Sequence, residues 1–244
     1  MGRIIAVVNQ KGGVAKTTTV LNVGAGLARH GKSVLLVDID PQGSLTKALA
    51  VDIREDENTL YELMTGKTEI DKAIRHLPGG YDLIPGDGRL SGIQKGTAHL
   101  KEALAPVVRK YDYILIDSSP YIGVLTVNAM VACKEIFVPL KPDYLAVMGI
   151  NQLMQAVNQV RTINKTLKVT GVIITMYNGR KRLANAIEEE LKDRYGKELF
   201  ETRIRENVAL AEAPTAGQDI FQYAPKSNGA KDHEALVNEI IERN

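Results

Sequence analysis

Residues that could bind phosphate lie together near the N-terminus, in the stretch QKGGVAKTT at positions 10–18. Gly12 and Gly13 have no Cβ, so the backbone N–H groups around them can approach phosphate oxygens closely. Lys16 is long enough to reach the β- and γ-phosphates of a nucleotide, and the hydroxyl of Thr17 can bind Mg²⁺. This pattern predicts a site for a nucleoside triphosphate with magnesium, in preference to a glycine turn without a ligand.

Three aspartates follow strand-like segments and could complete such a site. Asp38 and Asp40 alternate in DIDPQG, and Asp117 ends YILID. Open parallel sheets bind their ligands at the carboxyl ends of strands, where these acids are expected. Asp117 could hold a Mg²⁺-bound water, while Asp38 and Asp40 could face the Mg²⁺ water shell and an attacking water. Two simpler roles stay open: Asp38 could cap the next turn, and Asp117 could be a solvated strand-end acid.

The segments between these residues alternate between strand and helix patterns. Strands are predicted at 4–8, 33–38, 81–84, 113–117, 136–140, 169–175 and 199–204. Helices are predicted at about 17–29, 59–65, 70–75, 90–110 with a possible break before Pro106, 144–164, 181–195 and 230–243. This alternation is typical of a doubly wound, mostly parallel α/β sheet with helices on both faces. A single domain over residues 1–244 is expected.

The composition excludes several kinds of site. Cys133 is the only cysteine, which rules out an intramolecular disulfide and favours a reducing, cytoplasmic setting. The four histidines are scattered, so no metal other than Mg²⁺ is expected. No apolar run reaches about 18 residues, so no membrane span is predicted. The net charge of +2 confines any DNA-binding surface to a local patch.

Four segments of the chain resemble the ParA/Soj family of bacterial partition ATPases. They read NQKGGVAKTTTVLNVGAGLA, LLVDIDPQGSLT, YILID with S-S-P after it, and NVALAEAPTAGQDIFQYAPKSNGA. The first contains a pattern similar to the deviant Walker A motif, KGG-x-x-K-[ST]. Membership would imply an ATPase that dimerises on ATP and binds double-stranded DNA without sequence preference as the dimer. It would also imply slow hydrolysis until a ParB-type centromere-binding or adaptor protein stimulates it.

The resemblance also implies roles for individual residues. Lys11 would be the signature lysine that reaches the partner's ATP across the dimer, and Lys16 and Asp40 would be the other catalytic residues. Asp117 would hold Mg²⁺ through water, as Asp38 would more weakly, and Thr17 would bind Mg²⁺ directly. The nucleotide would be bound by Lys11, Gly12, Gly13, Val14, Ala15, Lys16, Thr17 and Thr18.

Three departures from the family pattern affect these expectations. Ala15 stands where the family usually has glycine, and its methyl group would be harmless at negative φ but obstructive at positive φ, where turnover would suffer. D-S-S-P replaces the commoner D-x-P-P at Asp117. Glu206 and Ala209 replace basic positions, including an arginine that contacts DNA in the family. Other cations could compensate, or could be ordinary solvated surface: Arg180, Lys181, Arg182, Arg203, Arg205 and Lys226.

Related P-loop proteins with other functions are less consistent with the sequence. An electron carrier like nitrogenase reductase needs cluster-ligating cysteines, and one cysteine per chain leaves a dimer only two. A MinD-like membrane ATPase would end in a basic amphipathic helix, whereas HEALVNEIIERN is acidic, so no membrane partner is expected. A bacterial tyrosine kinase would usually have a tyrosine-rich tail. Two interpretations remain: a DNA-segregation ATPase, and a ParA-like ATPase that positions another cellular cargo.

Overall fold

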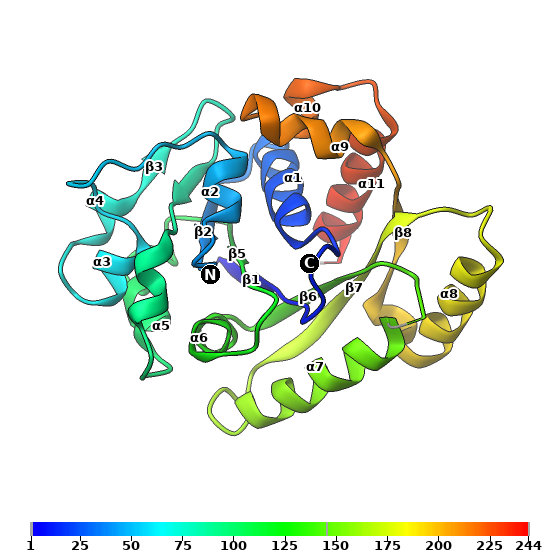
Figure 1. The fold of residues 1–244 in the computed structure, drawn as a ribbon, viewed down its shortest axis with the longest axis horizontal. Helices are drawn as coiled ribbons and strands as arrows, with labels where there is room; N and C mark the ends of the chain where they lie inside the picture. The colour runs from blue at the N-terminus through cyan, green and yellow to red at the C-terminus, as the bar shows by residue number, and fades with distance from the viewer. Residues whose placement is uncertain (1, 145, 244) are drawn as a thin grey trace.

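The structure, a computed structural model, describes residues 2–144 and 146–243. Residue 145, within the helix predicted at 144–164, lies outside the described residues. The described strands form one eight-stranded sheet in the order β3-β4-β2-β5-β1-β6-β7-β8 (Figure 1). The strands are β1 (Arg3–Val7), β2 (Val34–Asp38), β3 (Arg75–His76), β4 (Asp82–Ile84), β5 (Tyr113–Asp117), β6 (Glu135–Leu140), β7 (Lys168–Tyr177) and β8 (Leu199–Arg205). Only the short β3–β4 pairing is antiparallel among these strands.

Helices cover both faces of the sheet (Figure 1). The α-helices are α1 (Lys16–Arg29), α2 (Ser44–Ala48), α3 (Leu60–Met64), α4 (Ile70–Ala73), α5 (His99–Leu104), α6 (Val124–Ala132), α7 (Ala146–Val160), α8 (Arg182–Tyr195), α9 (Val208–Glu212), α10 (Ile220–Tyr223) and α11 (Asn228–Glu242). The described residues also form the 3₁₀ helices η1 (Gly88–Gly92), η2 (Gly196–Glu198) and η3 (Ala213–Ala216). The predicted doubly wound α/β fold is confirmed.

Two apolar cores result from the alternation of side chains along the central strands. In β1, Ala6 joins the core packed by α3, α5, α6, α7 and α8, whereas Ile5 and Val7 join the core packed by α1, α2, α10 and α11. The strands therefore carry buried side chains on both faces, as expected for parallel strands covered by helices. This packing fixes their carboxyl ends, where the candidate site lies.

The structure corrects several predicted elements. The helix predicted at 90–110 is instead η1 followed, after a break, by the short α5. Asp87 caps η1 by accepting a hydrogen bond from the N–H of Arg89, and Gly96 has φ of 85°, which interrupts a helix. α6 was not predicted, because its sequence VLTVNAMVA is apolar on nearly all sides and lacks a 3.6-residue period. Short helices α2, α9 and α10 lie in segments where no helix was predicted.

The outer edge of the sheet is protected by acidic side chains of α11. β8 is an edge strand, and Glu239 accepts hydrogen bonds from the N–H groups of Glu201 and Thr202 at 2.8 and 3.0 Å. Asp232 accepts a third, from the N–H of Arg205 at 3.0 Å. These contacts satisfy amides that could otherwise pair with another strand.

His233 on α11 is a buried histidine, with 1 % of its surface exposed. Its Nδ1 donates to the carbonyl of Gly229 at 2.9 Å. Burial lowers the pKa of this imidazole to about 4, whereas an unfolded histidine titrates near about 6.5. Between these two values the unfolded chain binds more protons than the folded one, so the stability due to this group is lost as the pH falls.

We therefore expect His233 to destabilise the protein in mild acid. Between about pH 7 and about pH 5 its titration should remove about 2 kcal/mol of the free energy of unfolding. Urea denaturation of the wild type and of His233→Gln at both pH values measures this. The buried acids Asp38 and Asp117 are present in both proteins, so their titration cancels in the comparison. An equal pH dependence in the two proteins would contradict the expectation.

Candidate nucleotide-binding site

The loop that joins β1 to α1 is fixed by buried polar contacts. Asn9 donates from Nδ2 to the carbonyl of Pro139 at 2.7 Å, and its Oδ1 accepts from the N–H of Lys11 at 2.9 Å. The hydroxyl of Thr175 donates to the carbonyl of Val14 at 3.1 Å. These contacts tie the loop to the ends of β6 and β7. Sequence analysis did not single out Asn9 or Thr175, because their partners are distant in the chain.

The loop and the start of α1 offer an anion site. Gly13 has φ of 69°, a left-handed conformation that its lack of Cβ permits. α1 begins at Lys16, and no side chain caps its N-terminus. The first amides of a helix lack partners within it, and its dipole is positive at this end. Gly13, Ala15 and Lys16 thus surround a place that fits phosphate oxygens.

Ala15 also has a left-handed conformation, with φ of 65°. This is the obstructive case of the two considered for the departure from glycine. A side chain in this region costs roughly 1–2 kcal/mol, whereas glycine loses about 0.4–1 kcal/mol through the entropy of the unfolded chain.

We expect Ala15→Gly to raise the free energy of unfolding by about 1 kcal/mol. Ala28→Gly, inside α1, is the matched control and should lower it by about 1 kcal/mol, because its backbone is already helical. Urea denaturation of both variants without nucleotide measures the difference. Destabilisation by Ala15→Gly would show that the φ of residue 15 carries no strain.

Lys16 is the cation at the centre of the site. It is 8 % exposed, and its Nζ lies 3.4 Å from the carbonyl oxygen of Lys11. Burial lowers the pKa of its ammonium group, while Asp117 and Asp40 act in the opposite direction. The side chain therefore lies in a low-dielectric place between the loop and two acids, where its charge interacts strongly with an anion.

Asp117 has the position expected of a magnesium-binding acid. It ends β5, in register with Val7 on β1 and Asp38 on β2. The hydroxyl of Thr17 donates to its Oδ2 at 2.7 Å. Its other oxygen, Oδ1, is buried and has no hydrogen-bond partner among the described residues. Burial, and then the charge of Asp38, raise the pKa of this carboxyl well above its usual range.

Asp38 is held by the protein itself. Its Oδ2 accepts from the N–H and the hydroxyl of Thr46 at 2.9 and 2.7 Å, and its Oδ1 from the N–H of Asp40 at 3.2 Å. Burial raises the pKa of Asp38 to about 6, although the bonds from Thr46 oppose this. These contacts fit the capping role that sequence analysis left open, and the weak role in holding Mg²⁺ stays a prediction.

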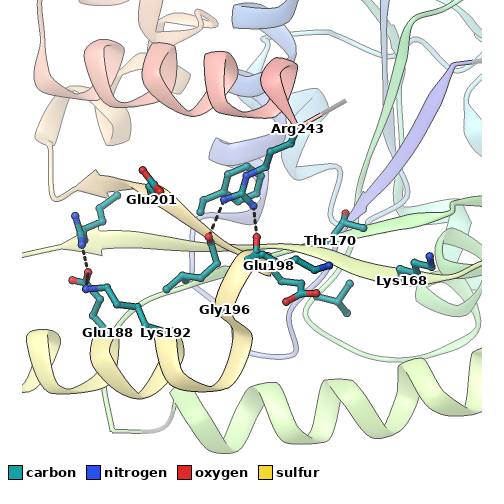
Figure 2. A pocket seen from close by; sticks show the side chains of 13 residues that line it. Lys168, Thr170, Glu188, Lys192, Gly196, Glu198, Glu201 and Arg243 are labelled. Atoms are coloured by element: carbon teal, nitrogen blue, oxygen red, sulfur yellow. Dashed lines mark hydrogen bonds and ion pairs between the residues drawn. The ribbon is translucent and has the colours of Figure 1, made fainter.

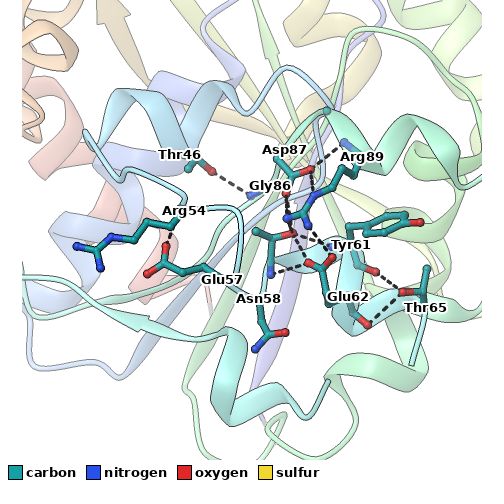
Figure 3. Close-up of polar contacts among 12 residues, drawn as sticks. Thr46, Arg54, Glu57, Asn58, Tyr61, Glu62, Thr65, Gly86, Asp87 and Arg89 are labelled. Atoms are coloured by element: carbon teal, nitrogen blue, oxygen red, sulfur yellow. Dashed lines mark hydrogen bonds and ion pairs between the residues drawn. The ribbon is translucent and has the colours of Figure 1, made fainter. Parts of the chain in front are cut away.

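The loop after β4 closes over Asp38. The N–H of Gly86 donates to the hydroxyl of Thr46 at 3.0 Å (Figure 3). A Cβ at Gly86 would lie 2.2 Å from the carbonyl oxygen of Asp38, so only glycine fits. The next residue, Asp87, forms an ion pair with Arg89 at 2.8 Å and accepts from the hydroxyl of Thr59 at 2.7 Å. The contact between Thr59 and Asp87 thereby holds the polar segment after α2 against the loop that follows β4.

Asp40 lies in the loop after β2 and is 6 % exposed. Its Oδ1 accepts from the N–H of Gln42 at 3.0 Å, and its Oδ2 lies 3.5 Å from the hydroxyl of Ser44. The second contact is long, so this oxygen keeps capacity to accept a hydrogen bond. Such a carboxylate can orient a water molecule.

The arrangement of charges fits magnesium and a triphosphate. Asp40 and Asp117 lie near the ammonium of Lys16, and Asp38 lies near Asp117. The unpaired Oδ1 of Asp117 and the hydroxyl of Thr17 are oxygen donors of the kind that Mg²⁺ prefers. When bound, Mg²⁺ supplies positive charge that offsets the negative charge of the phosphates. Thr17 and Asp117 would hold it.

Lys11 does not join these acids. Its Nζ forms an ion pair with Asp143, in the loop after β6. The Lys11 side chain is 31 % exposed, and its ion pair is with Asp143 and not with the carboxylates near Lys16. Sequence analysis did not identify Asp143 as a partner of Lys11.

Three of the six cations considered for DNA binding are already paired. Lys181 forms an ion pair with Glu206 at 3.0 Å, Arg205 pairs with Asp232 at 2.6 Å, and Arg203 pairs with Glu188. Within the described chain, no ion pair involves the other three, which are Arg180, Arg182 and Lys226. Glu206 thus neutralises the positive charge of Lys181 and adds no positive charge of its own.

Large apolar side chains are exposed beyond the carboxyl ends of the strands, at the same end of the sheet as the phosphate loop. Tyr121, Tyr144 and Val208 follow the carboxyl ends of β5, β6 and β8, and they are 76 %, 78 % and 72 % exposed. Large exposed apolar side chains are typical of interaction surfaces.

The sequence profile of a family described as an AAA domain matches residues 2–169. The chromosome-partitioning ATPase Soj of Thermus thermophilus is 41 % identical over 99 % of this chain and 96 % of that protein. The chromosome partitioning protein ParA of Caulobacter vibrioides is 36 % identical over 99 % of this chain and 94 % of that protein.

Solved structures of nucleotide-binding proteins share the fold. Cobyrinic acid a,c-diamide synthase from Mycobacterium smegmatis, with bound ADP and magnesium, has a TM-score of 0.86 and 32 % identity, covering 100 % of this chain and 95 % of that one. The septum site-determining protein MinD of Pyrococcus horikoshii, complexed with Mg-ADP, has a TM-score of 0.84 and 26 % identity, covering 98 % and 96 %. ATP and Mg²⁺ are accordingly the cofactors of the site.

Proposed function

The chain belongs to the ParA/Soj family of P-loop ATPases, and from this we propose that it is the ATPase of a DNA partition system. In this proposal ATP joins two subunits, and the dimer binds double-stranded DNA without sequence preference. A ParB-type centromere-binding or adaptor protein then stimulates hydrolysis, which is slow without it. The protein would be cytoplasmic and associated with the nucleoid.

The observation that carries the proposal is the position of Lys11 next to a complete phosphate site. Lys16, Thr17 and Asp117 can serve the nucleotide of their own subunit, whereas Lys11 is directed to Asp143. A second subunit could bring its own Lys11 to this nucleotide if the two phosphate loops face each other across a two-fold axis. Slow turnover would follow, because in the isolated subunit no second Lys11 reaches the nucleotide.

The exposed side chains around the loop support a dimer. Tyr121, Tyr144 and Val208 lie on the edge that would face the second subunit, and aromatic side chains are enriched in protein interfaces. ATP would then be part of the interface, since its phosphates lie between positive loops. Loss of the γ-phosphate would weaken the attraction.

DNA contact in the proposal depends on Arg180, Arg182 and Lys226, because these cations have no ion pair within the described chain. Their presentation by two subunits would double a weak patch. A gel shift of nonspecific DNA at fixed salt, with ATP, ADP or no nucleotide, tests this. Binding is expected with ATP alone, and it should weaken in Arg180→Ala more than in the paired Arg205→Ala. DNA binding without nucleotide, or none with ATP, would contradict the proposal.

A ParA-like ATPase that positions another cargo is the second candidate. The structural similarity to MinD favours it, as does the loss of charge through Glu206. This candidate predicts an ATP-dependent dimer that leaves DNA unshifted in the same gel. Among the described helices, none is long and apolar enough to cross a membrane.

We expect Asp40→Ala to bind ATP and dimerise normally but to hydrolyse ATP about 10²–10⁴-fold more slowly, because the carboxylate acts on water and not on the nucleotide. Phosphate release measured with saturating partner protein checks this. Asp52→Ala, which removes an exposed carboxylate outside the site, is the matched control and should hydrolyse ATP at the wild-type rate. Unchanged turnover in Asp40→Ala would exclude the role of Asp40.

A further inference from the structure

A pocket of about 680 Å³ lies at the amino ends of the strands, opposite the phosphate loop. It is lined by the start of β1 at Arg3 and Ile4 and by the start of β6 at Glu135, whereas the phosphate loop follows the carboxyl end of β1. Small apolar side chains contribute to its lining: Ala105, Val108, Val131, Ala132 and Cys133. The short side chains leave the pocket hollow, and its volume is typical of small-molecule sites.

The polar groups in the wall are already satisfied. Arg3 donates to both carboxylate oxygens of Glu135, at 2.8 and 2.7 Å. Asn164 donates from Nδ2 to the carbonyls of Met130 and Cys133, at 3.0 and 2.6 Å. These contacts neutralise the one acid of the lining and cap the end of α6. The wall therefore needs no further partner, and its chemistry is chiefly apolar.

The rim of the pocket carries excess positive charge. Lys101, Arg109 and Lys134 line it and are exposed, and no ion pair joins any of them to another described residue. The larger cavity at the start of β8, of about 1060 Å³, also has cations in its lining, but three acids accompany them: Glu188, Glu198 and Glu201. There Glu188 is paired with Lys192, and Arg243 donates to the carbonyls of Lys197 and Leu199 (Figure 2).

We propose that the pocket beneath Lys101, Arg109 and Lys134 binds a small amphiphilic anion, with its apolar body on the floor and its charge at the rim. Charge complementarity selects an anion over a cation or a neutral molecule. The concave shape suits a small molecule, since a protein partner would need a broader surface. The site is separate from the nucleotide site and goes beyond the proposed partition function.

Decanoate, kept below its micelle concentration, is the probe. Isothermal titration calorimetry should give one saturable site per chain that weakens as salt is added. Decyltrimethylammonium has the same tail and opposite charge, and acetate has the charge without the tail. Neither is expected to bind. In methyl NMR spectra, decanoate should shift the signals of Val108 and Val131 and leave that of Val14 in the phosphate loop unchanged.

Two variants separate the roles of rim and floor. The double variant Arg109→Glu, Lys134→Glu should bind decanoate at least about tenfold more weakly, whereas Lys231→Glu on α11 is the matched control and should bind normally. Ala105→Phe places a ring in the pocket from an exposed position and should abolish binding. Normal ATP binding shows that each variant is folded.

Three results would overturn the proposal: no saturable decanoate binding to the wild type, equal binding of decyltrimethylammonium, or undiminished binding by folded Ala105→Phe. Shifts confined to methyl groups outside the pocket would likewise assign the binding elsewhere.

Discussion

Lys16→Ala is expected to abolish ATP binding. The ammonium of Lys16 lies near Asp40 and Asp117 in the described site, and the side chain is nearly buried. Its loss removes charge-assisted contacts to two phosphates and leaves acids that repel the anion. Contacts of this kind contribute about 1.5–3 kcal/mol each, so affinity should fall at least about a hundredfold.

Isothermal titration calorimetry with ATP and Mg²⁺ measures this loss. Lys47→Ala is the matched control, because Lys47 donates to the backbone carbonyl of Gln42 at an exposed position nearby. Circular dichroism shows whether each variant is folded. Near-normal affinity in folded Lys16→Ala would refute the assignment of the phosphate loop.

Lys11→Ala is expected to bind ATP but to fail to form the ATP-dependent dimer. Its Nζ is paired with Asp143 in the isolated chain, so removal leaves the contacts of Lys16 and Thr17 intact. In a two-fold dimer the substitution removes one cation from each phosphate site. Two lost contacts of about 1.5–3 kcal/mol each should weaken the dimer at least about a hundredfold.

Analytical ultracentrifugation in ATP and Mg²⁺ measures the dimer, and calorimetry measures ATP binding separately. Lys32→Ala, at a half-buried position after α1, is the matched control and should dimerise normally. DNA binding should be lost together with the dimer if two cationic patches must act jointly. A Lys11→Ala dimer as stable as that of the wild type would exclude the action of this lysine in trans.

Local patterns in the sequence determined the type of fold and the chemistry of the main site. Apolar runs of four to six residues that end in Asp38, Asp117 or the phosphate loop already predict buried strands whose carboxyl ends meet. Gly12, Gly13 and Lys16 are close in sequence, so a phosphate site can be predicted from them without knowing which distant residues they contact. The fold confirms that the carboxyl ends of these strands meet.

Elements without a period of their own required the tertiary structure. α6 is apolar on nearly all sides and is a helix because it fills the space between the sheet and α5 and α7. The predicted helix 90–110 does not form as one element, because Asp87 caps η1 and Gly96 has a positive φ that interrupts a helix.

Which charged side chains pair with one another was decided by folding alone. Residue types predicted six candidate cations for DNA, but β8 and α11 bring Arg205 to Asp232, and α8 brings Glu188 to Arg203. Likewise, Asp38 accepts from Thr46, and Lys11 meets Asp143 across 132 residues of chain. Ion pairs depend on distances of a few ångströms between segments far apart in sequence, and only packing sets these distances.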